Sequence, residues 1–210
     1  MHPPTGVLVC FEGGEGSGKS TQSRRLREWL EAEGYAVVLT FEPGDTEVGK
    51  VLRRLVLDPT TGDLDPHTEA LLYAADRAEH VARLVRPALE RGEVVVMDRY
   101  VDSSLAYQGA GRDLDLAMVE RISRWATDDL RPHLTVVLDL EPEQGLGRFA
   151  ERDKIEGEGL EFHRRVREAF LRMAAADPEH YLVLDARAPV DEVAAAVRAR
   201  VEPLLGQAAR

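Results

Sequence analysis

The stretch FEGGEGSGKST, residues 11–21, carries the residue types and spacing best suited to chemistry. Gly13, four further residues and then Gly18-Lys19-Ser20 match the pattern G-x-x-x-x-G-K-[ST]. Glycines let the backbone N–H groups of such a loop surround an anion, and a helix that begins at the lysine adds its positive dipole end. The motif predicts a nucleoside triphosphate site, with Lys19 at the β- and γ-phosphates and Ser20 able to ligate Mg²⁺.

A carboxylate, Glu15, stands inside this loop, where an anion is expected to bind. Because such a loop binds phosphate through its backbone amides, the side chain of Glu15 can point away from the phosphates. We therefore assign the whole loop to ATP binding and leave Glu15 free to face another ligand. The predicted ATP-binding residues are Gly13, Gly14, Glu15, Gly16, Ser17, Gly18, Lys19, Ser20 and Thr21.

Alternating strands and helices must position this loop. Apolar runs rich in Val and Leu predict buried parallel strands at 7–11, 36–41, 93–98, 134–140 and 181–185. Helical patterns lie between them at 19–33, 66–91, 114–130, 156–177 and 189–205. The pattern predicts one α/β domain over residues 1–210, with a five-stranded parallel sheet flanked by helices on both faces. The stretches 42–64 and 145–159 are rich in Gly and charge and are predicted to be mobile.

Local signals mark several element boundaries. Gly34 is expected to cap the first helix, and Asp65 with Pro66 is expected to start the helix at 66–91. Pro87 is expected to kink that helix.

Composition excludes several broad classes. The net charge of −11 disfavours binding to nucleic-acid backbones. The single cysteine, Cys10, allows no disulfide framework, which fits a reducing cytosol. The N-terminus does not resemble a signal peptide, and no apolar run approaches the ~20 residues that span a bilayer. We expect a cytoplasmic protein that binds neither nucleic acid nor membranes.

Three candidate classes of protein that use such a loop can be compared with the rest of the sequence. A GTP-dependent switch reads guanine with an N-K-x-D motif, which is impossible here because the chain contains no Asn. A remodelling ATPase is usually larger and ends a strand in a carboxylate that activates water. A small-molecule kinase needs an acceptor pocket and a lid that carries arginines.

The end of the strand at 93–98 bears Asp98 and Arg99. A carboxylate there can hold Mg²⁺ through water, and the arginine can hold a phosphoryl group, because ligands gather at this edge of an open α/β sheet. A structural ion pair is the competing interpretation. It is less favoured when both residues stand at one strand end.

Tyr73 and Arg77 lie four residues apart and share a helix face. They could stack a base and hold an acceptor nucleotide. On this pair alone the favoured interpretation is structural, with Tyr73 in the core and Arg77 paired with Asp76 or Glu69.

A lid is predicted at about residues 145–157, a range that contains GLGRFAERDKIE at 145–156. Arg148 and Arg152 would point the same way if this segment is helical, and arginines stabilise the charge of a transferring phosphoryl group. The competing interpretation is a solvated, charged helix end.

The segments FEGGEGSGKSTQ, FEPGDTEVGKVLRRLVL, LLYAADRAEH and GLEFHRRVREAF follow one another along the chain with DRYVDSSLAYQGAGR at 98–112. Together they resemble thymidylate kinase of the bacterial type, over nearly the whole chain. The resemblance implies a P-loop kinase fold, ATP and dTMP as substrates, Mg²⁺ as cofactor, a role in dTTP synthesis, and a homodimer.

The resemblance also assigns roles to single residues. Tyr73 stacks on thymine, Ser104 and Gln108 read the base edge, and Tyr107 favours deoxyribose. Glu15 accepts a hydrogen bond from the 3′-hydroxyl group of dTMP. The implied dTMP-binding residues are Glu15, Glu42, Pro43, Arg53, Tyr73, Arg77, Arg99, Ser104, Tyr107 and Gln108; the catalytic residues are Lys19, Arg99, Arg148 and Arg152; the metal-binding residues are Ser20 and, through water, Asp98.

The chain departs from the family pattern R-E-P-G-G, because Phe41 and Asp45 replace the arginine and the last glycine. Gly16 follows Glu15 where one group of the family has a basic residue, which places the catalytic arginines in the lid. Two alternatives remain open: another nucleoside monophosphate kinase, or a regulatory module that binds ATP without transferring phosphate.

Overall fold

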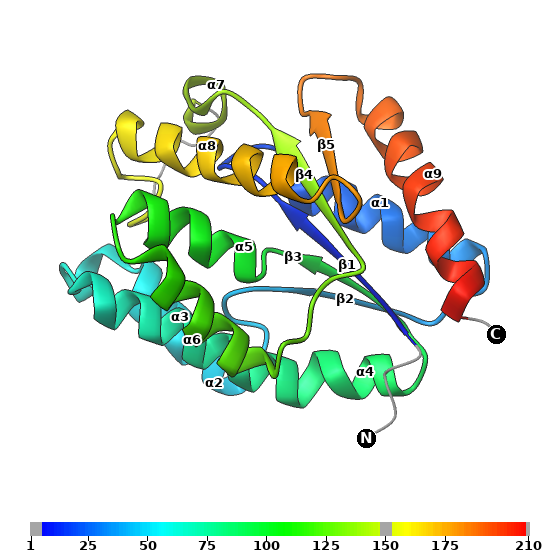
Figure 1. Cartoon of the computed structure of the whole chain (residues 1–210), viewed down its shortest axis with the longest axis horizontal. Coiled ribbons are helices and arrows are strands. Elements are labelled where there is room, and N and C mark those ends of the chain that lie inside the picture. The colour runs from blue at the N-terminus through cyan, green and yellow to red at the C-terminus, as the bar shows by residue number, and fades with distance from the viewer. Residues whose placement is uncertain (1–5, 148–152, 209–210) are drawn as a thin grey trace.

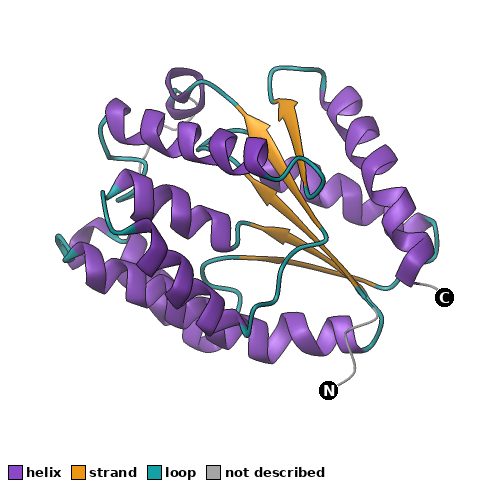
Figure 2. Cartoon of the chain, in the orientation of Figure 1, coloured by secondary structure: helices purple, strands orange, loops and turns teal. Residues whose placement is uncertain are grey.

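Five parallel strands form one sheet in the order β2-β3-β1-β4-β5 (Figures 1 and 2). The structure is a computed structural model and describes residues 6–147 and 153–208. All five predicted strands are confirmed. Their bounds are β1 Val7–Glu12, β2 Val37–Phe41, β3 Val94–Asp98, β4 Leu134–Asp139 and β5 Tyr181–Asp185.

Helices follow or connect the strands. Their bounds are α1 Lys19–Ala32, α2 Glu47–Leu57, α3 Pro66–His80, α4 Arg86–Glu90, α5 Val101–Ser104, α6 Leu116–Thr127, α7 Pro142–Leu146, α8 Leu160–Ala176 and α9 Val190–Ala208. A short 3₁₀ turn covers Pro59–Thr61, and π-helical segments cover Val81–Val85 and Leu105–Gly111. No helix in the described part of the chain combines the length and apolar character that crossing a bilayer requires.

The residues of β1 alternate between two cores. Val9 and Phe11 pack with α1 and α9 on one face of the sheet. Leu8 and Cys10 pack on the other face with the segment that runs from the π-helical turn into α4. Figure 1 shows α1 and α9 together on one side of the sheet and the remaining large helices on the other. The doubly wound α/β expectation is therefore confirmed, while the single-domain organisation over 1–210 stays a prediction.

The predicted boundary signals act as expected, with one difference. After α1, Gly34 has φ +90° and donates to Glu31 O, while Tyr35 donates to Leu30 O, which completes a Schellman cap. The Asp65 carboxylate accepts from His67 N at 2.9 Å at the start of α3. Before Pro87 the chain forms a π-helical turn instead of a simple kink, which accommodates a residue that lacks an N–H.

The stretch 42–64, which is predicted to be mobile, forms the helix α2 at its centre. Thr46 caps this helix by accepting from Gly49 N at 2.9 Å. A Cβ on Gly49 would lie 2.4 Å from Asp76 Oδ1, so this glycine lets α2 approach α3 closely. The glycine that suggested a loop thus permits helix–helix packing.

Asp76 joins the segment before α2 to α3. Its Oδ1 accepts from Gly44 N at 3.1 Å, its side chain is almost fully buried, and its Oδ2 has no hydrogen-bond partner among the described residues. Burial and the nearby Glu42 raise the pKa of Asp76 from 3.8 to about 6. The ionised form of Asp76 is therefore costly in the folded protein.

We expect Asp76→Asn to gain stability relative to the wild type as pH rises from 4 to 7. Because the pKa of Asp76 is higher in the folded state, its contribution is present below pH 3.8 and is lost as pH rises through about 6. The difference in unfolding free energy should change by roughly 1 to 3 kcal/mol across this range. Thermal or urea unfolding at several pH values measures it. Asp113→Asn provides a surface control, and a difference that does not change with pH would contradict the prediction.

Candidate functional site

The glycine-rich loop lies between the end of β1 and the start of α1, as the motif predicts. Gly13, Gly16 and Gly18 all have positive φ angles, of 133°, 66° and 94°. Lys19 is buried and donates from Nζ to Gly13 O at 3.0 Å and to Gly14 O at 2.8 Å. Burial and the nearby Arg99 lower the pKa of Lys19. The loop thus holds a desolvated ammonium group beside its own backbone.

Ser20 and Asp98 meet at the edge of the loop. β1 and β3 pair with Phe11 opposite Asp98, and this register brings Asp98 beside the first turn of α1. Ser20 Oγ donates to Asp98 Oδ2 at 2.6 Å. A hydroxyl group and a carboxylate at this separation are oxygen ligands of the kind that Mg²⁺ takes, so the two residues fit the predicted metal site.

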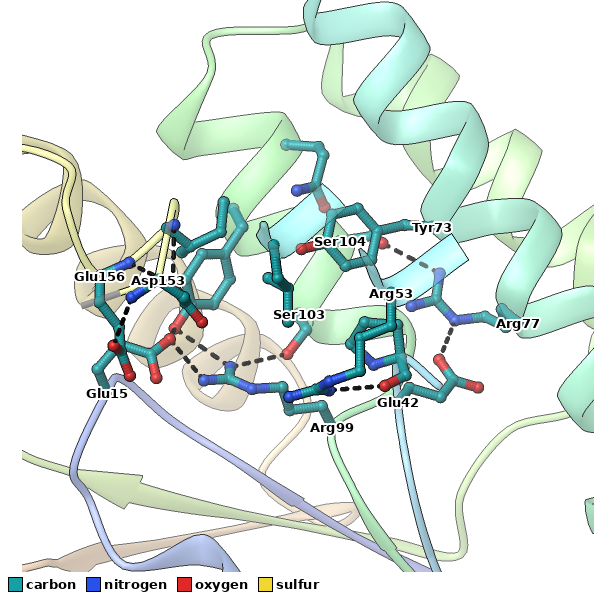
Figure 3. Close-up of a pocket in the computed structure, with 15 residues that line it drawn as sticks. Glu15, Glu42, Arg53, Tyr73, Arg77, Arg99, Ser103, Ser104, Asp153 and Glu156 are labelled. Carbon is teal, nitrogen blue, oxygen red and sulfur yellow. Dashed lines mark hydrogen bonds and ion pairs between the residues drawn. The ribbon is translucent and has the colours of Figure 1, made fainter. Parts of the chain in front are cut away.

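A second pocket, named the acceptor pocket after the residues predicted to bind the acceptor, opens beside the loop and encloses about 670 Å³, part of it open to solvent (Figure 3). All ten predicted acceptor residues line it. The lining residues are Glu15, Glu42, Pro43, Arg53, Leu57, Tyr73, Arg77, Arg99, Ser103, Ser104, Tyr107, Gln108, Asp153, Ile155 and Glu156. They come from five regions of the chain, and the fold brings them together around one cavity.

Glu15 points out of the loop and into this pocket. Its Oε1 accepts from Arg99 Nη2 at 2.6 Å and from the Tyr107 hydroxyl group at 2.9 Å (Figure 3). Burial opposes ionisation of Glu15, but Arg99 and Lys19 outweigh it and lower the pKa of the carboxyl to about 2. The carboxylate that looked misplaced in a phosphate loop therefore belongs to the wall of the neighbouring pocket.

Arg77 donates to three groups that fix its position. Its Nε donates to Glu42 Oε2 at 2.8 Å, its Nη1 to Ser104 Oγ at 3.0 Å and its Nη2 to Tyr100 O at 3.0 Å. On the far side of Glu42, His80 Nδ1 lies 2.9 Å from Oε1. Arg77 thus pairs with Glu42, and the expected pairing with Asp76 or Glu69 is wrong.

Tyr73 is half-buried and lines the acceptor pocket, one helical turn before Arg77. The interpretation of Tyr73 as a core residue is therefore wrong. Its ring is available to a ligand in the pocket.

The two departures from the family pattern lie outside the pocket wall. Asp45 Oδ2 accepts from Thr40 Oγ1 at 2.5 Å, which draws its carboxylate away from the acceptor residues. The Phe41 ring is partly exposed and lies 5.7 Å from the Arg53 guanidinium carbon. Arg53 also donates to Pro43 O at 2.7 Å, so it is held between the aromatic ring and the backbone.

Sequence reasoning missed a carboxylate beneath the site, Glu12. Its Oε1 accepts from Tyr100 N at 2.8 Å and Ser103 N at 3.1 Å, and its Oε2 from Ser103 Oγ at 2.7 Å. Burial and the neighbouring Asp102 raise the pKa of Glu12 well above its usual range. The sequence did carry a signal for Glu12, because this residue directly follows the apolar run at 7–11. The same pattern, a carboxylate at the end of an apolar run, identified Asp98.

The remaining missed residues carry weaker signals. Leu57 and Ile155 line the pocket with apolar atoms, and no pattern distinguishes them from core residues. Asp153 Oδ1 accepts from Ile155 N at 2.9 Å and Glu156 N at 2.8 Å, which orders the turn beside the pocket. The missed lining residues are Leu57, Ser103, Asp153, Ile155 and Glu156.

The two predicted lid arginines, Arg148 and Arg152, lie outside the described residues. The described residues on either side of this gap, Gly145 and Lys154, both contact other parts of the chain. Gly145 packs so closely on the phosphate loop that a Cβ would lie 2.0 Å from Glu15 O. Lys154 donates from its backbone to Leu57 O at 3.2 Å and from its ammonium group to Gly62 O. Lys154 is thereby directed at the chain segment after α2.

Comparison with known proteins agrees with this geometry. A family model for thymidylate kinase matches residues 11–197. The thymidylate kinase of Cutibacterium acnes is 52% identical over 202 residues, which cover 96% of this chain and 99% of that protein. That of Clavibacter sepedonicus is 54% identical over 209 residues, which cover 98% and 99%. The crystal structure of thymidylate kinase from Ehrlichia chaffeensis superposes with a TM-score of 0.79 at 29% identity, over 95% of this chain and 100% of that one. The chain belongs to the thymidylate kinase family.

Proposed function

We propose that this protein transfers the terminal phosphoryl group of ATP to dTMP and forms dTDP for dTTP synthesis. One observation carries the proposal. The carboxylate of the phosphate loop, Glu15, is held in the wall of a second pocket by Arg99 and Tyr107. A donor loop that forms part of an acceptor pocket places the two substrates side by side, as direct transfer requires.

The pocket residues have the chemistry that dTMP needs. The Tyr73 ring offers a flat partner for a base, and Ser104 and Gln108 offer polar groups for its edge. Arg53 and Arg99 offer guanidinium groups for the phosphate. The Tyr107 hydroxyl group lies 2.9 Å from Glu15 Oε1, and together they occupy the sugar end of the pocket.

Catalysis rests on position and positive charge. Lys19 and Arg99 neutralise the transferring group from the loop and from the end of β3, and Arg148 and Arg152 are assigned to the same task from the sequence alone. The acceptor phosphate is already ionised near neutral pH, so no strong general base is needed. Ser20 and Asp98 would hold Mg²⁺, which supplies charge neutralisation at the phosphates of ATP.

An acceptor panel tests the proposal. Purified protein with Mg-ATP and dTMP, dUMP, UMP, CMP, AMP or GMP should release ADP fastest with dTMP. Equal or faster use of a ribonucleotide would favour another nucleoside monophosphate kinase. ADP release with none of the six acceptors would favour the regulatory module.

Glu15→Gln should lower kcat/KM for dTMP at least tenfold. The amide keeps the shape of the side chain but leaves the Arg99 guanidinium without its anionic partner, which disturbs both the sugar and the phosphate ends of the pocket. Steady-state kinetics measures the loss, with the exposed Glu28→Gln on α1 as the matched control. Undiminished activity would remove Glu15 from the acceptor site.

The active form is proposed to be a cytoplasmic homodimer. Val48, Val51 and Leu55 recur at helical spacing on α2, yet 51%, 47% and 39% of their surfaces are exposed. Leu71, on the adjacent α3, is also exposed. An apolar stripe turned outward across two neighbouring helices supports an interface with a second copy.

Light scattering on a sizing column should give the mass of two chains for the wild type, and Val51→Asp should give the mass of one. Burying a carboxylate in an apolar interface is unfavourable, so the substitution should separate the copies. Val190→Asp, at an exposed position that begins α9, is the control and should stay dimeric. A monomeric wild type, or a dimeric Val51→Asp, would contradict the proposed interface.

A further inference from the structure

A buried carboxylate, Glu69, lies behind the acceptor pocket. It belongs to α3 and lies four residues before Tyr73 and eight before Arg77, so all three share one helix face. Only 2% of its surface is exposed. Gln108 lines the acceptor pocket, whereas Glu69 lines a neighbouring cavity together with Arg112.

Three N–H groups converge on this carboxylate. Gln108 Nε2 donates to Oε1 at 2.9 Å, and Arg112 donates from Nε to Oε1 at 3.2 Å and from Nη2 to Oε2 at 3.0 Å. Arg112 also pairs with Glu158, and its guanidinium carbon lies 5.1 Å from the centre of the Phe162 ring. Glu69 thus meets Arg112 as the carboxylate of a two-bonded ion pair, and a carboxylate can only accept hydrogen bonds.

An acceptor-only partner fixes the direction of the Gln108 amide. The amide has one end that donates and one that accepts, and the two ends have nearly the same shape. Because Glu69 cannot donate, the NH₂ end of Gln108 must face it. The carbonyl oxygen is then the end left for a ligand in the pocket.

We propose that Glu69 is a positioning residue that sets base specificity through Gln108. With its carbonyl oxygen toward the ligand, Gln108 favours pyrimidines that carry an N–H at ring position 3, which are thymine and uracil. Cytosine presents a lone pair at that position, so two acceptors would face each other without a proton between them. A site built to hydrogen-bond one pattern rejects the opposite pattern strongly, because its buried polar group is left unpaired. The inference rests on the proposed function, since it takes dTMP as the acceptor.

The deoxynucleotides dUMP and dCMP give the cleanest comparison. Both lack the thymine methyl group and have the same sugar and phosphate, so they differ only at the edge that Gln108 would read. The wild type should use dUMP with at least 100-fold higher kcat/KM than dCMP.

Glu69→Gln should reduce this dUMP-to-dCMP ratio at least tenfold, with KM for ATP unchanged. An amide at position 69 can donate as well as accept, so Gln108 can turn and offer its NH₂ end to cytosine. A purely structural role would lower both activities in parallel and leave the ratio unchanged. Glu158→Gln is the matched control, because it removes the other anionic partner of Arg112 and keeps the contact between Glu69 and Gln108.

Glu69→Asp is the second test variant, to be used if Glu69→Gln does not fold. The shorter side chain keeps a carboxylate beside Arg112 but moves it away from Gln108. It should also lower the ratio at least tenfold. An unchanged ratio in folded Glu69 variants that still phosphorylate dTMP would overturn the inference alone. A wild type that phosphorylates none of dTMP, dUMP and dCMP would overturn the proposed function and this inference together.

Discussion

The ion pair between Glu15 and Arg99 joins the donor and acceptor sides of the site, and the surrounding structure positions its two partners. Glu15 comes from the loop after β1 and Arg99 from the end of β3, neighbouring strands whose parallel register places Phe11 opposite Asp98. Arg99 has φ +69°, a left-handed conformation that is unfavourable for a residue with a Cβ. Such strain persists only where the surrounding contacts compensate for it. The contacts of the turn after β3 therefore determine where the guanidinium of Arg99 points.

The buried Glu12 side chain provides contacts that compensate for the strain at Arg99, because it holds the turn after β3. Arg99 N donates to Phe11 O, and the N–H groups of Tyr100 and Ser103 donate to the Glu12 side chain. Ser103 Oγ then links the two side chains, since it accepts from Arg99 Nη1 at 3.3 Å and donates to Glu12 Oε2 at 2.7 Å. One buried side chain thus fixes both the backbone and the side chain of Arg99. Glu69 has the same relation to Gln108, so carboxylates outside the pocket orient the groups that line it.

The strands, the phosphate loop and the grouping of ten residues around one pocket could be predicted from the sequence, because each has a local pattern or a specific motif. The helix α2 was missed although Val48, Val51 and Leu55 recur at helical spacing, because the glycines and charged residues of the stretch 42–64 suggested a loop. The partners of Arg77 could not be predicted either. Glu42 lies 35 residues away in the sequence, and Asp76 is adjacent in sequence but turns toward Gly44. Local patterns identify which residues are polar and buried, whereas only the fold decides which pairs meet.

The absence of a side chain at Gly16 has a packing explanation. Its φ is +66°, and a Cβ there would lie 2.6 Å from Gly145 O, at the base of the predicted lid. A Cβ on Gly145 would in turn lie 2.0 Å from Glu15 O. Two glycines facing each other let α7 rest directly on the phosphate loop and leave no room for an arginine at position 16. In such a loop, positive charge beyond Lys19 and Arg99 has to come from a segment other than position 16, and α7, which ends at Leu146, leads into the predicted lid. The packing of Gly16 against Gly145 supports the proposal that Arg148 and Arg152 take that task.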